Sequence, residues 1–128
     1  MNKFFFDVGA NIGTTFDWLA TQPHDYKDHI FFLFEPSPRH FAKLIEKTRE
    51  AFANGYQQIN LCPFGVRDTN GVFVFYEKDD TKGDSFAVQT ASDHATTNAR
   101  DTYSVIGAAV CLSHFIRQVT KPGDEIVL

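Results

Sequence analysis

Two short apolar segments that each end in a carboxylate constrain the fold of this chain most strongly. Residues 3–8 contain three consecutive phenylalanines and then Asp7, and residues 30–35 contain five apolar residues and then Glu35. A short continuous apolar run is typical of a strand that is buried on both faces, as the strands of parallel sheets are. The sequence therefore predicts two neighbouring strands of a parallel sheet.

Helical patterns follow both predicted strands. Apolar residues at helical spacing predict a short helix over 12–20, with Thr14 or Thr15 as its N-cap. Ser37 is a favourable N-cap for a second helix, which begins with a proline and ends at the Asn-Gly pair 54–55. The buried face of this second helix is expected to carry Phe41, Leu44, Ile45, Thr48 and Phe52.

A third strand is predicted over 56–64, near a sheet edge, so strands and helices alternate along the chain. This order favours parallel strands joined by right-handed crossovers. We therefore expect one domain, residues 1–128, with a Rossmann-like α/β fold: an open, mostly parallel sheet with helices on both faces. Further along, a strand over 72–77 is expected to pair with the end of 60–68. A helix over 110–119 and a last strand over 125–128 complete the pattern.

The polar segment 78–104 is long for a structureless connection, which favours a mobile lid or a segment that a ligand orders. Asp84, Ser85 and His94 within it could line a site, but we expect them to be solvated loop residues. His24, His29 and His40 lack the spacing of metal ligands and are expected at the surface. His114 could act as a base, but a structural role in its helix is the simpler expectation.

Charge and composition exclude several function classes. The net charge is −4 and no basic run stands out, which argues against nucleic acid as a partner. No stretch reaches the roughly 18 apolar residues of a membrane span, and no signal peptide is evident, so we expect a cytoplasmic protein. Cys62 and Cys111 show no metal-ligand spacing; two free thiols are favoured over one disulfide.

The carboxyl ends of the first two strands are where an open α/β sheet binds its ligands. Gly9 and Gly13 would let the backbone approach a ligand closely, and Glu35 is placed to accept hydrogen bonds from both hydroxyls of a ribose. The pyrophosphate fingerprint is absent. The negative charge of Asp7 would also repel a pyrophosphate, by several kcal/mol at ~4 Å and an effective dielectric near 20. That charge instead favours S-adenosylmethionine, which carries an ammonium, a sulfonium and a ribose, over NAD.

Four stretches, in this order, resemble the FkbM-type methyltransferases, a branch of the class I S-adenosylmethionine-dependent enzymes. They are FFFDVGANIGTT, FLFEPSPRHFAKL, INLCPFGVRDTNGVFVFY and AVCLSHFIRQVTKPGDEIVL, and they touch most of the chain apart from about residues 78–107. The resemblance implies that Glu35 holds the cofactor ribose and that Phe64 and Gly65 approach the adenine. It also implies which residues lie around the methionine part of the cofactor: Asp7, Gly9, Ala10, Asn11 and Gly13.

The resemblance ends at Leu128, where the family continues into an acidic Asp-x-Glu-Gly motif that faces cofactor and acceptor. We therefore expect the cofactor-binding portion of a methyltransferase, truncated after its fourth core strand; a small natural protein is the alternative. The family implies O-methylation of a sugar or another small hydroxyl-bearing acceptor, and no general base can be named. A non-catalytic binding module and an NAD-dependent oxidoreductase remain alternatives. An exposed edge at 125–128 would favour a homo-oligomer.

Overall fold

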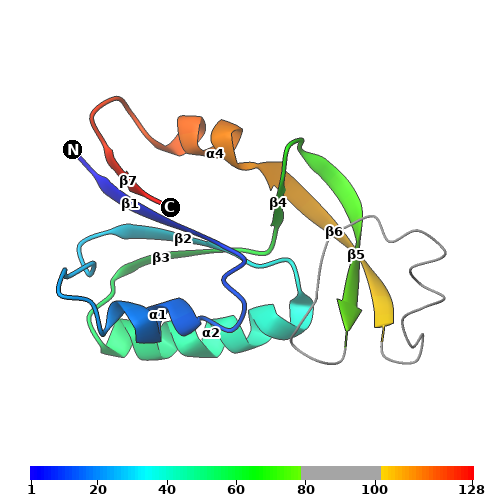
Figure 1. Ribbon diagram of the computed structural model, residues 1–128, viewed down its shortest axis with the longest axis horizontal. Coiled ribbons are helices and arrows are strands. Elements are labelled where there is room, and N and C mark those ends of the chain that lie inside the picture. Colours follow the sequence, from blue (N-terminus) through cyan, green and yellow to red (C-terminus); the bar gives the residue numbers. More distant parts are fainter. Residues whose placement is uncertain (79–101) are drawn as a thin grey trace.

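The computed structural model describes residues 1–78 and 102–128, and in it four parallel strands form the central sheet (Figure 1). The strand order is β3-β2-β1-β7. The bounds are β1 (Lys3–Val8), β2 (Ile30–Phe34), β3 (Gln58–Cys62) and β7 (Glu125–Val127). Phe6 lies opposite Phe32 in the register, and Val8 lies opposite Phe34. The predicted α/β fold with a mostly parallel sheet is confirmed, as is β3 at a sheet edge. β7 pairs with β1 on the other side of the sheet.

Helices pack on both faces of this sheet (Figure 1). On one face α1 (Thr14–Leu19) and α2 (Pro38–Ala53) cover a core that includes Phe5 and Phe31. On the other face α4 (Leu112–Val119) covers Phe4 and Phe6. Successive side chains of a strand point to opposite faces, so the three phenylalanines of β1 supply both cores.

A second, three-stranded sheet stands beyond the carboxyl ends of the parallel strands (Figure 1). Its order is β4-β6-β5, with β4 (Gly65–Arg67), β5 (Gly71–Lys78) and β6 (Thr102–Cys111). The expected pairing of β5 with the end of 60–68 is wrong: β5 pairs antiparallel with β6, and β4 pairs parallel with β6 on its other side. The sequence did not predict β6, because its small residues and polar start resemble the preceding polar segment. The following helix begins at Leu112 rather than at 110, because Val110 and Cys111 belong to β6.

The sequence predicted the N-cap of α2 correctly but not that of α1. Ser37 caps α2 as predicted, because its Oγ accepts a hydrogen bond of 3.2 Å from the His40 amide. The N-cap of α1 is Gly13 rather than a threonine, and no side chain caps that helix. A left-handed backbone at Gly13, with φ of 87°, makes the turn into the helix.

The buried face of α2 is rotated relative to the prediction. The residues that face the sheet are His40, Leu44, Thr48 and Ala51, a spacing of four, four and three. Ile45 and Phe52 are exposed, contrary to the expectation. Apolar residues flank the true face on both sides, so the sequence pattern alone could not fix the rotation of the helix.

Two histidines that were expected at the surface are buried. His29 is fully buried before β2, with its Nδ1 2.8 Å from Asp28 Oδ1 and its Nε2 3.6 Å from Glu125 Oε1. His40 is 2% exposed, because it lies on the sheet-facing side of α2. His24 is exposed, as expected. The sequence around His29 is polar and gave no sign of its burial; in the structure the His29 ring packs against the rings of His24 and Tyr26.

The remaining expectations have mixed outcomes. Both cysteines are free thiols, Cys62 buried and Cys111 partly exposed. Most of the polar segment, including Asp84, Ser85 and His94, lies outside the described residues. Within the described ranges, none of the helices has the length and apolar character that crossing a bilayer requires.

Candidate functional site

The turn between β1 and α1, residues 9–13, is here called the glycine loop, and it is fastened to the end of β2. The amides of Gly9 and Ala10 both donate to the Phe34 carbonyl, at 3.0 and 2.9 Å. Gly9 and Asn11 have positive φ values of 74° and 52°. Asparagine adopts the left-handed conformation more readily than most residues with a side chain, and further contacts fix the position of Asn11.

Glu35 supplies one such contact. Its Oε2 accepts a hydrogen bond of 2.7 Å from the Asn11 amide, and its Oε1 accepts one of 2.9 Å from the Ser37 amide. Glu35 is only 5% exposed. The structure therefore brings together the glycine loop and Glu35, as the sequence predicted, and adds the start of α2 to this group.

Asp7 lies at the end of β1, where its carboxylate is partly buried. Its Oδ2 accepts a hydrogen bond of 2.6 Å from the Thr15 hydroxyl. Burial raises the pKa of Asp7, and the Thr15 hydrogen bond lowers that pKa by a smaller amount. Among the side chains that the structure describes, no cationic group pairs with this carboxylate.

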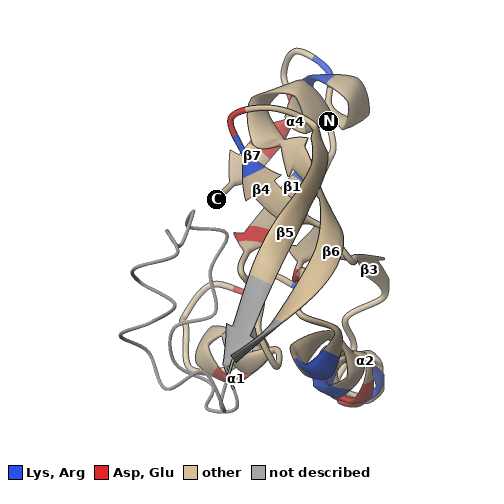
Figure 2. Cartoon of the chain, turned by 90° about the vertical axis from the view of Figure 1, so that its right-hand side faces the viewer, with Lys and Arg blue, Asp and Glu red and all other residues tan. Residues whose placement is uncertain are grey.

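An apolar pocket of about 420 Å³, here called the Glu35 pocket, opens beside Glu35. Three prolines, the first turns of α2 and a stretch of β6 form its walls. The residues that line it are Glu35, Pro36, Pro38, Phe41, Ala42, Ile45, Pro63, Val105, Ile106, Gly107 and Ala108. The wall from β6 is uncharged, since β6 contains no Lys, Arg, Asp or Glu (Figure 2). Apolar walls with a single carboxylate suit a flat ring system that carries polar groups at one end.

Asp7 does not line the Glu35 pocket. It lines a separate hollow of about 340 Å³, here called the Asp7 pocket, between β1, α1 and Leu128. Its other lining residues are Phe5, Phe6, Val8, Thr15 and Trp18. The two carboxylates that the sequence assigned to one ligand therefore open into different hollows, and the glycine loop lies between them in the chain.

Asn11, which the resemblance placed near the methionine part of the cofactor, carries a buried acceptor. Its Oδ1 is buried and has no hydrogen-bond partner among the described residues. A buried polar atom without a partner is uncommon in native proteins and needs an explanation such as a ligand or an ordered water. Together with the carboxylates of Asp7 and Glu35, it makes this end of the sheet rich in acceptors.

Phe64 and Gly65, which were expected near an adenine, do not line the Glu35 pocket. Phe64 packs against the core under α4, and Gly65 is buried opposite Ala109 in the β4–β6 pairing. The neighbouring Pro63 lines the pocket instead. The contribution of β6 was missed altogether, because only the pairing of distant strands brings residues 105–108 to this position.

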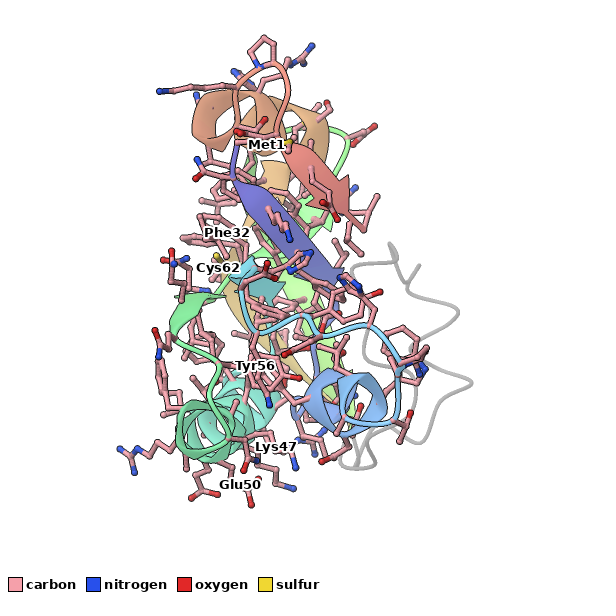
Figure 3. The ribbon with its side chains drawn as sticks, turned by 90° about the vertical axis from the view of Figure 1, so that its left-hand side faces the viewer. Met1, Phe32, Lys47, Glu50, Tyr56 and Cys62 are labelled. Atoms are coloured by element: carbon pink, nitrogen blue, oxygen red, sulfur yellow. The ribbon has the colours of Figure 1, made fainter. Side chains whose placement is uncertain are left out.

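The other polar groups that the structure describes form weaker candidates for a functional site. A third pocket of about 390 Å³ lies between α1 and α2, and one of its lining residues, Lys47, pairs with Asp17 at 2.6 Å. Lys47 also pairs with Glu50 at 3.1 Å, and both of these side chains are labelled on α2 in Figure 3. His114 is exposed on α4 and lines neither the Glu35 pocket nor the Asp7 pocket. No cluster of His, Cys, Asp and Glu within residues 1–78 and 102–128 could hold a metal ion.

Comparison with known proteins adds no relative. No protein-family model, no curated protein and no solved structure matches this chain.

Proposed function

We propose that this chain is a Rossmann-like class I domain that binds S-adenosylmethionine and transfers its methyl group. One observation carries the proposal: the glycine loop is fastened to Glu35 at the strand ends, and the partly buried Asp7 beside it has no cationic partner among the described residues. Burying an unpaired carboxylate is unfavourable. A cationic ligand that carries a nucleoside would offset this cost and use both features.

The Glu35 pocket is the proposed nucleoside site. Its apolar walls suit an adenine ring, with the ribose toward Glu35. The glycine loop would then lie along the methionine part, where the orphaned Asn11 oxygen can accept a hydrogen bond. In this arrangement neither Phe64 nor Gly65 contacts the adenine ring, because neither lines the Glu35 pocket.

The proposed reaction is an in-line transfer. S-adenosylmethionine, held by Glu35 and the glycine loop, would supply its methyl group to an acceptor oxygen and would leave as a neutral thioether. Alignment of the oxygen with the S–CH₃ bond supplies several kcal/mol of the barrier reduction. A base takes the hydroxyl proton, and a sugar or another small hydroxyl compound is the proposed acceptor. The second candidate is a binding module that keeps the cofactor pocket without the acceptor side, and an NAD-dependent oxidoreductase is the third.

Calorimetric titration separates these candidates. S-adenosylmethionine and S-adenosylhomocysteine should bind the purified chain, and NAD should not. Tight NAD binding without a response to either sulfur compound contradicts the proposal. Binding of both sulfur compounds without methyl transfer to any hydroxyl acceptor supports the module instead.

A charge-removing variant tests the role of Asp7. Asp7→Asn keeps the shape and the acceptor for Thr15 but removes the negative charge. Because only S-adenosylmethionine carries the sulfonium charge, its affinity should fall more than that of S-adenosylhomocysteine. Asp17→Asn is the matched control, since Asp17 is exposed on α1 and pairs with Lys47. An equal loss for both ligands in Asp7→Asn would mean that Asp7 does not sense the sulfonium.

A further inference from the structure

Glu35 makes contacts that a residue dedicated to a ribose would not need. Both of its carboxylate oxygens accept hydrogen bonds from backbone amides, those of Asn11 and Ser37. Asn11 belongs to the glycine loop, and Ser37 is the N-cap of α2. These two amides help to stabilise the buried carboxylate, and the ring of His40 also lies near it, with its Nδ1 3.9 Å from Glu35 Oε1.

The sequence around Ser37 limits which backbone amides can donate a hydrogen bond to Glu35. Pro36 and Pro38 have no backbone N–H, so the Ser37 amide is the only one at this turn, and it donates to Glu35. On the other side, the amides of Gly9, Ala10 and Asn11 donate in succession to the Phe34 carbonyl and to Glu35. Glu35 is the only one of these acceptors that is a side chain, so it is the one that mutation can remove.

We propose that Glu35 is a positioning residue that holds the glycine loop against the first turn of α2, and that nucleoside binding depends on this support more than on hydroxyls of the ribose. The binding part of this inference rests on the proposed function; the support of the loop does not. Asparagine tolerates the left-handed conformation found at Asn11, and the hydrogen bond from its amide to the Glu35 carboxylate ties this part of the loop to the end of β2. Without that acceptor, the Asn11 amide would lose its partner and the loop would relax away from the pocket.

Amide hydrogen exchange of the unmodified protein tests the support directly. The amides of Asn11 and Ser37 should be protected in the absence of any ligand, and Glu35→Gln should accelerate the exchange of both. Glu46→Gln is the matched control, because Glu46 is exposed on the same α2 helix. Fast exchange of either amide in the unmodified protein overturns the proposal, and this outcome needs no folded variant.

Two nucleosides test whether binding depends on the support of the loop or on the ribose hydroxyls. Adenosine has both ribose hydroxyls, and 2′,3′-dideoxyadenosine has neither. If Glu35 acts through the loop, Glu35→Gln should lower the affinity for both nucleosides by a similar factor, about tenfold. Glu46→Gln should lower the affinity for neither nucleoside. If Glu35 acts through the ribose, only adenosine should lose affinity, and the proposal is then wrong.

The two experiments also separate this inference from the proposed function. If neither nucleoside binds the unmodified protein, the nucleoside site is wrong and the binding part of the inference fails with it. Protected Asn11 and Ser37 amides would still establish Glu35 as the support of the loop. If adenosine binds but both amides exchange fast, the nucleoside site stands and the positioning role falls.

Discussion

The hydroxyl of Thr15 lies 2.6 Å from Asp7 Oδ2 and joins the second residue of α1 to the end of β1. No other hydrogen bond to the Asp7 side chain is found among the described residues. This pair explains how α1 keeps its position although no side chain caps its start. It also explains how a carboxylate is tolerated directly after three buried phenylalanines.

Thr15→Val should destabilise the protein by about 1.5–3 kcal/mol, because it leaves a partly buried carboxylate without its donor. Thr14→Val is the matched control, since Thr14 is exposed and is the preceding residue of the same helix. Urea unfolding of both variants and of the unmodified protein measures the difference. Similar midpoints for the two variants would show that the Thr15 hydrogen bond contributes little.

The stability of the protein should depend on pH through Asp7. Its pKa in the folded state is raised above the usual value of 3.8, so between these two values the folded state keeps a proton that the unfolded chain has released. The contribution of Asp7 to stability is therefore greatest below 3.8 and is lost as the pH rises through the raised pKa.

Asp7→Asn removes this dependence and still offers Thr15 an acceptor. Urea unfolding from about pH 3 to about pH 7 should show the variant gaining stability relative to the unmodified protein, with a plateau above the raised pKa. A difference that stays constant with pH would mean that folding does not raise the pKa of Asp7.

Alanine at the two loop glycines should have unequal effects. Both have positive φ, but a Cβ at Gly9 would meet open space, whereas one at Gly13 would lie 2.8 Å from Lys47 Cγ. We expect Gly9→Ala to cost about 1–2 kcal/mol from backbone strain alone. Gly13→Ala should cost about 2–4 kcal/mol, since it also crowds α2. Thermal unfolding of both variants measures the order, and a larger loss for Gly9→Ala would contradict the packing of α1 against α2.

The two thiols should differ in reactivity. Burial raises the pKa of Cys62 to about 11, while the Ser113 hydroxyl near the partly exposed Cys111 lowers the pKa of that thiol. A disulfide reagent near neutral pH should therefore modify Cys111 quickly and Cys62 only on unfolding. Cys111→Ser should remove the fast phase, and Cys62→Ser should leave it. A fast phase that survives in Cys111→Ser would place the reactive thiol at Cys62.

The β7 edge predicts self-association. Within the described residues β7 is an outer strand of the central sheet, and Ile126 is 45% exposed. An unpaired apolar strand edge is a template for another chain. Sedimentation should show a concentration-dependent oligomer that Ile126→Lys dissolves. Val74→Lys, on the outer strand β5 of the second sheet, is the control. If Val74→Lys dissolves the oligomer and Ile126→Lys does not, the second sheet is the interface.

Much of the fold followed from local sequence. The apolar runs of β1 and β2 are too short for helices, and Ser37 with Pro38 marks the start of α2 by chemistry that acts within one turn. The meeting of the glycine loop and Glu35 was also predictable, because the carboxyl ends of neighbouring parallel strands share one edge of the sheet. These features need only information from adjacent residues and the alternation of strands and helices.

The tertiary structure decided the rest. Only the pairing of β6 with β5 and β4 brings residues 105–108 to the Glu35 pocket. The burial of His29 likewise depends on how the segment before β2 folds, with the His29 ring against those of His24 and Tyr26. The sequence placed two carboxylates at one end of the sheet, but it did not show that Glu35 is engaged by two amides while Asp7 opens into another hollow. Burial and hydrogen-bond partners depend on residues that are distant in the chain, and local sequence patterns carry no information about which of them meet.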